Sequence, residues 1–354
     1  MAATGQKGLY VNMNTGAVQA YLPPFRNALI NGDMRINQRG TSTNLASLTA
    51  VATATPGSFV TDRWNVYRPG FVAGASIGQG TGMVYADLPF SEAGIATYAR
   101  VGRTAANAAT TAIYCDYNME SQDSYRLVGK TVTLSFYYRT GTNFSDNFLT
   151  ATLHSGTATD AALRSGTFAS FATTAVAKSS SWARATVTGT VPTSAAQVCL
   201  RFSYTPVGTA GNADHFDVTG VQLELGSVAT PFEVRPYSVE LATCQRYAIN
   251  CSKYIGTGHV RGNSIFDGLL TLPVNLRKII TSSDISYSSF YVSIGNLDIS
   301  TGGDVNALII SVVVDESSST TAYISLRLTI STTILTVGQA GLLRPTKLII
   351  NAEI

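Results

Sequence analysis

The chain has 354 residues, enough for two or three domains that each bury a core of their own. Charged residues make up only 13% of it, about half of the roughly 25% that is usual in globular domains. Its net charge of +3 comes from 24 basic and 21 acidic residues, a balance that excludes nucleic acid or an anionic membrane as an electrostatically bound partner. The longest apolar run, 307–314, is far shorter than the ~20 residues of a membrane-spanning helix, so we expect no membrane insertion.

The first 26 residues differ from the rest of the chain. Glycines and the Pro23-Pro24 pair interrupt them, and they show little apolar periodicity, which is typical of an arm without a core. The basic, apolar and small-residue plan of a secretory signal is missing, so we expect assembly in the cytosol of the producing cell. We predict that residues 1–26 form a docking arm.

Residues 27–237 consist of short β runs separated by glycine- and proline-containing breaks. In the run 131–138, Val132, Leu134 and Phe136 fall on one face, as expected for a half-buried antiparallel strand. Further runs cover 183–191, 197–204 and 215–225. The number and spacing of these runs predict an all-β antiparallel jelly-roll sandwich, the architecture of many carbohydrate-binding modules.

The run 215–225 ends in an alternating pattern. Val221, Leu223 and Leu225 alternate with Gln222 and Glu224, which predicts a strand with one buried and one solvent-facing side. The glycine at position 226 then ends the strand.

A helix is expected after the prolines at 231 and 236. Ser238 stands at an N-cap position and Glu240 in the first turn, so we predict a helix from about residue 239 to 251. Leu241 and Cys244 lie at helical spacing along it. Residues 238–252 are therefore predicted to be a helical connector between two β domains.

Residues 253–354 are predicted to form a second β-sandwich domain. The runs 307–314 and 321–330 flank a polar loop and indicate a hairpin. Leu348, Ile350, Ala352 and Ile354 alternate to the last residue, which predicts that the C-terminus is a paired strand.

Three ordered motifs carry a family resemblance. They are N-A-L-I-N-G-D-M-R-I-N-Q-R-G-T at 27–41, T-D-R-W at 61–64 and V-Q-L-E-L-G-S-V-A-T-P-F-E-V-R-P-Y-S-V-E-L-A-T-C-Q-R at 221–246. In this order they resemble the tail-fibre-like virion proteins of bacteriophages and prophages, over residues 27–247. The resemblance implies a structural virion protein, a homotrimer, and an arm that docks on a tail or baseplate protein.

This resemblance leads to one main functional hypothesis and two alternatives. The main hypothesis is a tail fibre that adheres to a host-surface polysaccharide without catalysis, with residues 253–354 as the receptor-binding tip. A weakly charged β surface rich in tyrosine is compatible with adhesion. The alternatives are a capsid decoration or head-fibre protein, and a tailspike that depolymerises glycan.

The sequence contains no recognisable catalytic motif. His154, His215 and His259 lie far apart and have no ligand-spaced neighbours, which argues against a zinc site. Glycosidases need only two suitably spaced acids, so four carboxylates keep an enzyme open as an alternative: Asp62, Asp214, Asp217 and Glu224. We expect no enzymatic activity, with Asp62 bound to local backbone beside Arg63 and Glu224 facing solvent.

Aromatic residues are abundant, with 17 Tyr, 14 Phe and 2 Trp. Sugars stack their C–H faces on such rings, so exposed rings are candidate carbohydrate-binding residues. We expect both tryptophans, Trp64 and Trp182, to pack in the core. The candidate carbohydrate-binding residues are Tyr287, Phe290 and Tyr291 in a polar run of the C-terminal domain, and Tyr114 and Tyr117 around Cys115.

No cofactor is expected. A structural calcium ion, bound by Asp, Asn and backbone oxygens, is the one alternative that jelly-roll modules leave open, although no EF-hand spacing occurs in the sequence.

Overall fold

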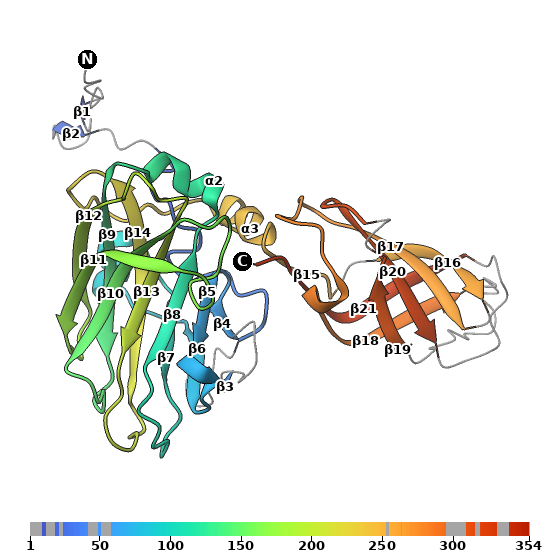
Figure 1. The fold of residues 1–354 in the computed structure, drawn as a ribbon, viewed down its shortest axis with the longest axis horizontal. Coiled ribbons are helices and arrows are strands. Elements are labelled where there is room, and N and C mark those ends of the chain that lie inside the picture. The colour runs from blue at the N-terminus through green and yellow to red at the C-terminus, as the bar shows by residue number, and fades with distance from the viewer. Residues whose placement is uncertain are drawn as a thin grey trace.

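The computed structural model describes residues 9–11, 18–20, 24–41, 49–50, 58–252, 255–262, 264–294, 309–315, 319–330 and 340–353. The described chain is almost entirely β, in a larger jelly-roll part and a smaller C-terminal sheet, with helix α3 between them (Figure 1). Within the described ranges, none of the helices has the length and apolarity to span a bilayer.

Eight strands build the jelly roll. Their bounds are β7 Tyr98–Arg103, β8 Ile113–Asn118, β9 Thr131–Thr140, β10 Phe148–Gly156, β11 Phe168–Ala177, β12 Ala183–Thr190, β13 Gln197–Tyr204 and β14 His215–Leu225. One sheet has the order β11-β10-β13-β8 and the other β12-β9-β14-β7, with every pairing antiparallel. These are the two interlocked Greek keys of a jelly roll, so the predicted fold is confirmed.

Shorter elements extend this sandwich. Strands β5 (Trp64–Tyr67) and β4 (Ser58–Thr61) are added to the first sheet at its β8 edge. Strands β6 (Ala75–Gly80) and β3 (Thr49–Ala50) are added to the second sheet at its β7 edge. Helices α1 (Leu88–Ala93) and α2 (Ser121–Ser124) lie in connections between strands. Near the N-terminus, β1 (Leu9–Val11) pairs with β2 (Val18–Ala20) as a separate hairpin (Figure 1).

The core lies between the two sheets and contains Trp64. Its ring is fully buried, with ring centroids 5.1 Å from Tyr117 and 6.1 Å from Phe202. Phe136 and Leu134 of β9 face the same cluster from the second sheet. The predicted core position of Trp64 and the predicted inner face of 131–138 are therefore confirmed. The strand is not half-buried, however, because Thr133, Ser135 and Tyr137 on its other face are buried too.

The prediction that Gln222 and Glu224 face solvent is wrong. Gln222 is 0% and Glu224 3% exposed, because the chain after β14 folds back over this side of the strand. The backbone N–H of Thr230 donates to Glu224 (2.8 Å), and Gln222 donates to Glu224 (2.8 Å). Gly226 does end the strand, and its φ of +109° is one that glycine adopts without strain.

Helix α3 spans Tyr237–Gln245, so both predicted ends were displaced. The N-cap is Pro236 and not Ser238, and the N–H groups of Val239 and Glu240 both donate to the Pro236 carbonyl. The helix ends early because the next residues pair elsewhere. Strand β15 (Ala248–Asn250) binds the last strand of the chain, and this tertiary pairing outweighs a further helical turn.

In the part of the C-terminal domain that the structure describes, seven strands form one sheet around its own apolar cluster. The order is β15-β21-β16-β17-β20-β19, and β18 pairs with β21. The bounds are β16 Gly256–Gly262, β17 Ile265–Thr271, β18 Ile285–Ile294, β19 Ile309–Val314, β20 Tyr323–Ile330 and β21 Ala340–Asn351. The hairpin of β19 and β20 and the paired C-terminal strand β21 are as predicted.

Candidate functional site

The first and third sequence motifs meet at the edge of β14. The side chain of Asn27 donates to the carbonyl of Val221 (3.0 Å) and accepts from the N–H of Leu223 (3.0 Å), as a neighbouring strand would. The N–H of Ala28 also donates to the carbonyl of Leu223 (2.7 Å). Residues 194 or more positions apart are thus held in one hydrogen-bonded layer.

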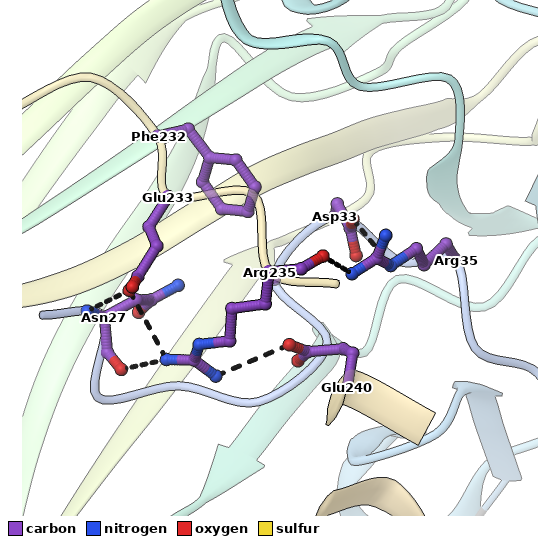
Figure 2. Close-up of a pocket in the computed structure, with 8 residues that line it drawn as sticks. Asn27, Asp33, Arg35, Phe232, Glu233, Arg235 and Glu240 are labelled. Carbon is purple, nitrogen blue, oxygen red and sulfur yellow. Dashed lines mark hydrogen bonds and ion pairs between the residues drawn. The ribbon is translucent and has the colours of Figure 1, made fainter. Parts of the chain in front are cut away.

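Arg235 ties these two motifs together (Figure 2). Its guanidinium donates to the carbonyls of Asn27 and Leu29 and lies 3.5 Å from the Glu240 carboxylate. Glu233 accepts from the N–H of Asn27 (2.9 Å). These side chains leave no room for a water molecule between them and cross the gap with their own hydrogen bonds, so the arrangement is a structural joint.

The second motif joins the same network. The indole N–H of Trp64 donates to the carbonyl of Asn31 (3.0 Å), and the Asn31 amide donates to the carbonyl of Asp62 (2.9 Å). The Asp62 carboxylate accepts from the N–H of Gln38 (3.1 Å) and from Arg39 (3.1 Å). The Asp62 carboxylate therefore binds the backbone of the first motif. The prediction that it binds local backbone beside Arg63 is wrong.

Arg63 links the jelly roll to the end of the chain. Its side chain is 1% exposed and forms an ion pair with Glu353, which also lies 3.2 Å from Arg39. The guanidinium stacks on Tyr247, 3.5 Å from the ring centroid. The C-terminus accordingly lies against the jelly roll beside α3 (Figure 1). The three motifs, with Glu353 and Tyr247, thus form what we call the motif joint.

The remaining candidate acids of a glycosidase are also held by cations. Asp214 is bound by Arg103 (2.6 Å). Asp217 is bound by both Arg100 and Arg139, each at 2.7 Å. These carboxylates are fully buried, so their present geometry stabilises the second sheet.

The structure also bears on the calcium alternative. The described residues hold no group of three or more His, Cys, Asp or Glu side chains that could bind a metal ion. Where loop carbonyls converge, a guanidinium occupies the centre. Arg68 donates to the carbonyls of Ala109 (2.8 Å) and Ala73 (3.1 Å), and Arg103 donates to the carbonyl of Gly208 (2.7 Å).

A different set of side chains gathers on the outer face of the first sheet. Residues directly opposite in an antiparallel pair share one face. Tyr67 faces Tyr114 across the β5–β8 pair, and Arg201 lies opposite Asp116 across the β8–β13 pair. His154 stands one row further along, opposite Cys199. With Arg164 from the β10–β11 connection, we call this set the tyrosine face: Tyr67, Tyr114, Asp116, His154, Arg164 and Arg201.

The centre of the tyrosine face is rigidly built. Arg201 donates two hydrogen bonds to Asp116, at 2.8 and 2.7 Å, and also donates to the Tyr67 hydroxyl. Its guanidinium stacks on Tyr114 at 3.9 Å from the ring centroid. The Tyr67 and Tyr114 rings meet edge to face at 5.4 Å. Tyr67 and Asp116 are buried, so the half-buried Tyr114 and Arg201 are the groups of this centre that can stack on a sugar and bond its hydroxyls.

Two further side chains of this face have unused bonding capacity. Both ring nitrogens of His154 are covered and make no hydrogen bond to a described residue. Burial, with a contribution from Arg201, lowers the pKa of His154 to about 4, so the ring is neutral at neutral pH. Arg164 is half-buried and makes no hydrogen bond or ion-pair contact with a described residue, although Asp116 attracts it from a longer distance.

The two predicted tyrosines of β8 separate in the structure. Tyr114 is half-buried on the tyrosine face, whereas Tyr117 is 1% exposed and packs in the core against Trp64. Positions three apart in a strand face opposite sides, so both could not serve one surface. The Tyr117 hydroxyl is occupied as well, since it accepts from the N–H of Ile30 (2.9 Å).

The C-terminal candidates lie along β18. Tyr287 is 38% exposed and stands opposite Leu348 of β21. The side chains of Phe290 and Tyr291 lie outside the described residues.

Trp182 is buried, as predicted, but in a separate cluster. It is 8% exposed and meets Tyr98 edge to face at 5.4 Å on the outer side of the second sheet. Arg139 stacks on its ring at 4.7 Å from the centroid. The core position expected for Trp182 is thus a satellite cluster outside the sandwich.

Sequence reasoning missed most of the tyrosine face. Alternation along β8 places Asp116 on the same side as Tyr114, and this signal was available. The contributions of Tyr67, Arg201 and His154 depend on which strands pair and in which register. A sequence without its strand pairing does not show this.

No family model and no curated protein match the sequence. Among solved structures, the enzymatically active domain of tailspike protein 4 from bacteriophage CBA120 is 12% identical with a TM-score of 0.35. That match covers 58% of this chain and 22% of the tailspike chain, so this chain spans about a fifth of its length.

Carbohydrate-binding modules are also similar in fold. A CBM4 structure is 16% identical with a TM-score of 0.32, covering 52% of this chain and 100% of its own. The CBM22-2 xylan-binding domain of Xyn10C from Paenibacillus barcinonensis is 13% identical with a TM-score of 0.31, covering 51% and 100%.

Proposed function

We propose that this chain is a non-catalytic structural protein of a bacteriophage virion that adheres to host-surface glycan through the tyrosine face. The three ordered motifs support the virion assignment. The tyrosine face carries the adhesion proposal, because it brings aromatic rings, a bidentate Arg201–Asp116 pair and the unpaired polar side chains of His154 and Arg164 onto one side of a rigid sheet.

The absence of catalysis is part of this proposal. Glycoside hydrolysis needs one protonated acid and one carboxylate that both face the substrate. Asp214 and Asp217 are each neutralised by arginine, and Asp62 and Glu224 are buried in the motif joint and beneath residue 230. A soluble polysaccharide incubated with the protein should therefore release no new reducing ends.

The proposed binding surface is tested with Tyr114→Ala. Removal of the ring should weaken binding to host-surface polysaccharide about tenfold or more, since buried aromatic anchors dominate binding energy. Affinity electrophoresis or calorimetry measures this. Tyr125→Ala is the matched control, because Tyr125 is 81% exposed and lies outside the tyrosine face. Equal binding by both variants would refute adhesion through this face.

The C-terminal domain offers a second contact in this proposal. Tyr287 is exposed there. The C-terminal sheet extends away from the jelly roll (Figure 1), which supports our proposal that it is a receptor-binding tip. Comparison of the single variants Tyr287→Ala and Tyr114→Ala separates the contributions of the two surfaces. If only the Tyr287 substitution reduces adsorption of phage to cells, the adhesive site belongs to the tip.

We place the protein in the tail, as a homotrimer docked to a tail or baseplate protein through residues 1–26. Three copies would multiply individually weak glycan contacts. Mass photometry at micromolar concentration should give three times the monomer mass, and a stable monomer would contradict the trimer. Antibody labelling of virions, viewed by electron microscopy, should mark the tail; label over the head would instead support capsid decoration.

A further inference from the structure

The charges of the tyrosine face do not cancel. Asp116 is its one carboxylate, and it is satisfied by the bidentate contact with Arg201. Arg164 adds a second guanidinium, because the residue before it is hydrogen-bonded to Asn118 on the outer face of β8 (2.9 Å). The face therefore carries one positive charge more than its carboxylate balances.

Arg164 is held in place by the chain around it. The N–H of the preceding residue, Leu163, donates to the side chain of Asn118 (2.9 Å), which belongs to the outer face of β8. The N–H of Ala161 donates to Gln197 at the start of β13 (2.8 Å). The β10–β11 connection is thus fastened to the sheet at two residues just before Arg164.

A half-buried arginine without a partner is costly. Burial lowers the pKa of Arg164, because the charged guanidinium has lost part of its hydration and the attraction of Tyr67 and Asp116, neither of which is bonded to it, restores only part of that loss. Five N–H donors in a planar fork match the geometry of an incoming carboxylate, which would restore the lost interactions.

The ring beside it matches the rest of a sugar. Tyr114 is half-buried, and its ring offers an apolar surface for the C–H face of a pyranose. Both nitrogens of His154 are covered, so this ring borders the site without offering a sugar a free donor or acceptor. An anionic group and an apolar ring face occur together in an acidic sugar.

We infer that the tyrosine face recognises a carboxylate-bearing sugar, such as a uronic acid residue, with Arg164 as the group that binds the carboxylate. This inference rests on the proposed function and names its substrate class. Arg201 does not serve this purpose, because Asp116 already occupies its fork and Tyr114 covers its plane.

The test uses pairs of glycans that differ only in charge. The full-length protein is applied to a glycan array containing uronic acid oligosaccharides and the same oligosaccharides after reduction of their carboxyl groups. Acidic members should bind at least about tenfold more tightly than their reduced counterparts, the effect of one charge-assisted hydrogen-bonded pair. Binding should weaken as salt increases.

Arg164→Gln should abolish this preference while leaving the weaker binding of the reduced glycans in place. Arg126→Gln is the matched control, since Arg126 is exposed beside α2 and outside the tyrosine face. Thermal melting establishes that both variants fold. Bound glycans that are neutral, or an acidic preference that survives Arg164→Gln, would overturn the inference.

The two proposals fail in distinguishable ways. Neutral glycans bound in a Tyr114-dependent manner would refute the acidic-sugar inference and support adhesion through this face. If neither Tyr114→Ala nor Arg164→Gln changed the binding of any glycan, adhesion through the tyrosine face itself would be refuted.

Discussion

Asp33 is a buried carboxylate of the motif joint. It is 7% exposed, lies 3.0 Å from Arg35, and has one carboxylate oxygen that makes no hydrogen bond to a described residue. Burial, opposed in part by Arg35, raises its pKa from 3.8 to about 6. The folded protein therefore binds this proton more tightly than the unfolded chain does.

We expect stability to depend on pH through this group. Because the folded-state pKa is raised, its stabilising contribution is complete below about pH 4 and is lost as pH rises through about 6. Asp33→Asn mimics the protonated form, so it should increase the free energy of unfolding at pH 7 by roughly 3 kcal/mol. It should also flatten the pH profile between these values.

Urea denaturation across this pH range provides the measurement. Glu92→Gln, at an exposed position, serves as the control and should leave the profile unchanged. A destabilised Asp33→Asn protein at pH 7 would show that the Arg35 ion pair outweighs the cost of burying the charge.

Arg63 presents the opposite case, a buried cation with a good partner. Glu353→Gln should lower the free energy of unfolding by about 3–5 kcal/mol, because it leaves the Arg63 guanidinium buried and uncompensated. Arg63→Met in the same chain should restore part of this loss, since Met fills the space beside Tyr247 and Tyr117 without a charge. Chemical denaturation of the two single variants and the double variant measures the coupling. Additive losses would mean that this pair does not hold the joint.

At the scale of elements, arginines organise the loops at one end of the jelly roll. Arg68 is 1% exposed and donates to the carbonyls of Ala73, Ala109 and Thr111, which come from two different connections. Arg103 reaches the β13–β14 connection in the same way. The loop carbonyls thus satisfy the donors of each buried guanidinium. In return, each guanidinium holds together the loops to which those carbonyls belong.

Arg68→Lys should therefore loosen a specific loop. An ammonium cannot reproduce the planar fork, so at least one buried carbonyl loses its donor, at a cost of about 1–3 kcal/mol. Hydrogen exchange should quicken in residues 104–111 while β9 and β14 remain protected. Uniformly faster exchange across both sheets would show that Arg68 supports the whole sandwich and not this loop.

Tertiary pairing also decided where elements end. The helical spacing of residues 237–251 continues past Gln245, yet the chain leaves α3 there because Ala248, Ile249 and Asn250 pair with β21. Glu224 has a polar position in an alternating strand, yet it is buried because Thr230 folds over it. In both cases the local signal was correct for an isolated segment, and a partner distant in sequence changed the result.

At the scale of the whole molecule, the jelly roll and the C-terminal domain share a polar boundary. Arg277 from the C-terminal domain lies 3.2 Å from Asp160, and Arg246 after α3 lies 3.0 Å from Glu120. The N–H of Asn250's side chain donates to the carbonyl of Gln38 (3.0 Å), which places β15 against the first motif. These contacts join two separate hydrophobic clusters.

A chain that ends at Ser252 tests this boundary. It removes Glu353 and β21, so β15 loses its partner and Arg63 its counter-ion. We expect the truncated jelly roll to fold but to melt at a lower temperature, and Arg63→Met to recover part of the loss. Calorimetry of the full and truncated chains measures this. An unchanged melting temperature would mean that the two domains are energetically independent.

Much of the fold followed from the sequence alone. The jelly roll, the glycine that ends β14, the β19–β20 hairpin and the paired C-terminal strand all rest on alternation and turn residues, which act over a few positions. The three motifs were also visible, but their shared role was not, because Asn27, Asp62 and Arg235 meet only after the sheets have formed.

The sequence by itself determined which residues can form strands and which side chains carry charge or aromatic rings, since backbone preference and side-chain chemistry are local properties. Only the tertiary structure decided what those side chains do. The register of the strand pairs placed Tyr114 beside Tyr67 and Arg201 and Tyr117 in the core. The return of the C-terminal residues to the jelly roll paired Arg63 with Glu353. Both results depend on contacts between distant segments, and the free energy of those contacts exists only when the strands have paired.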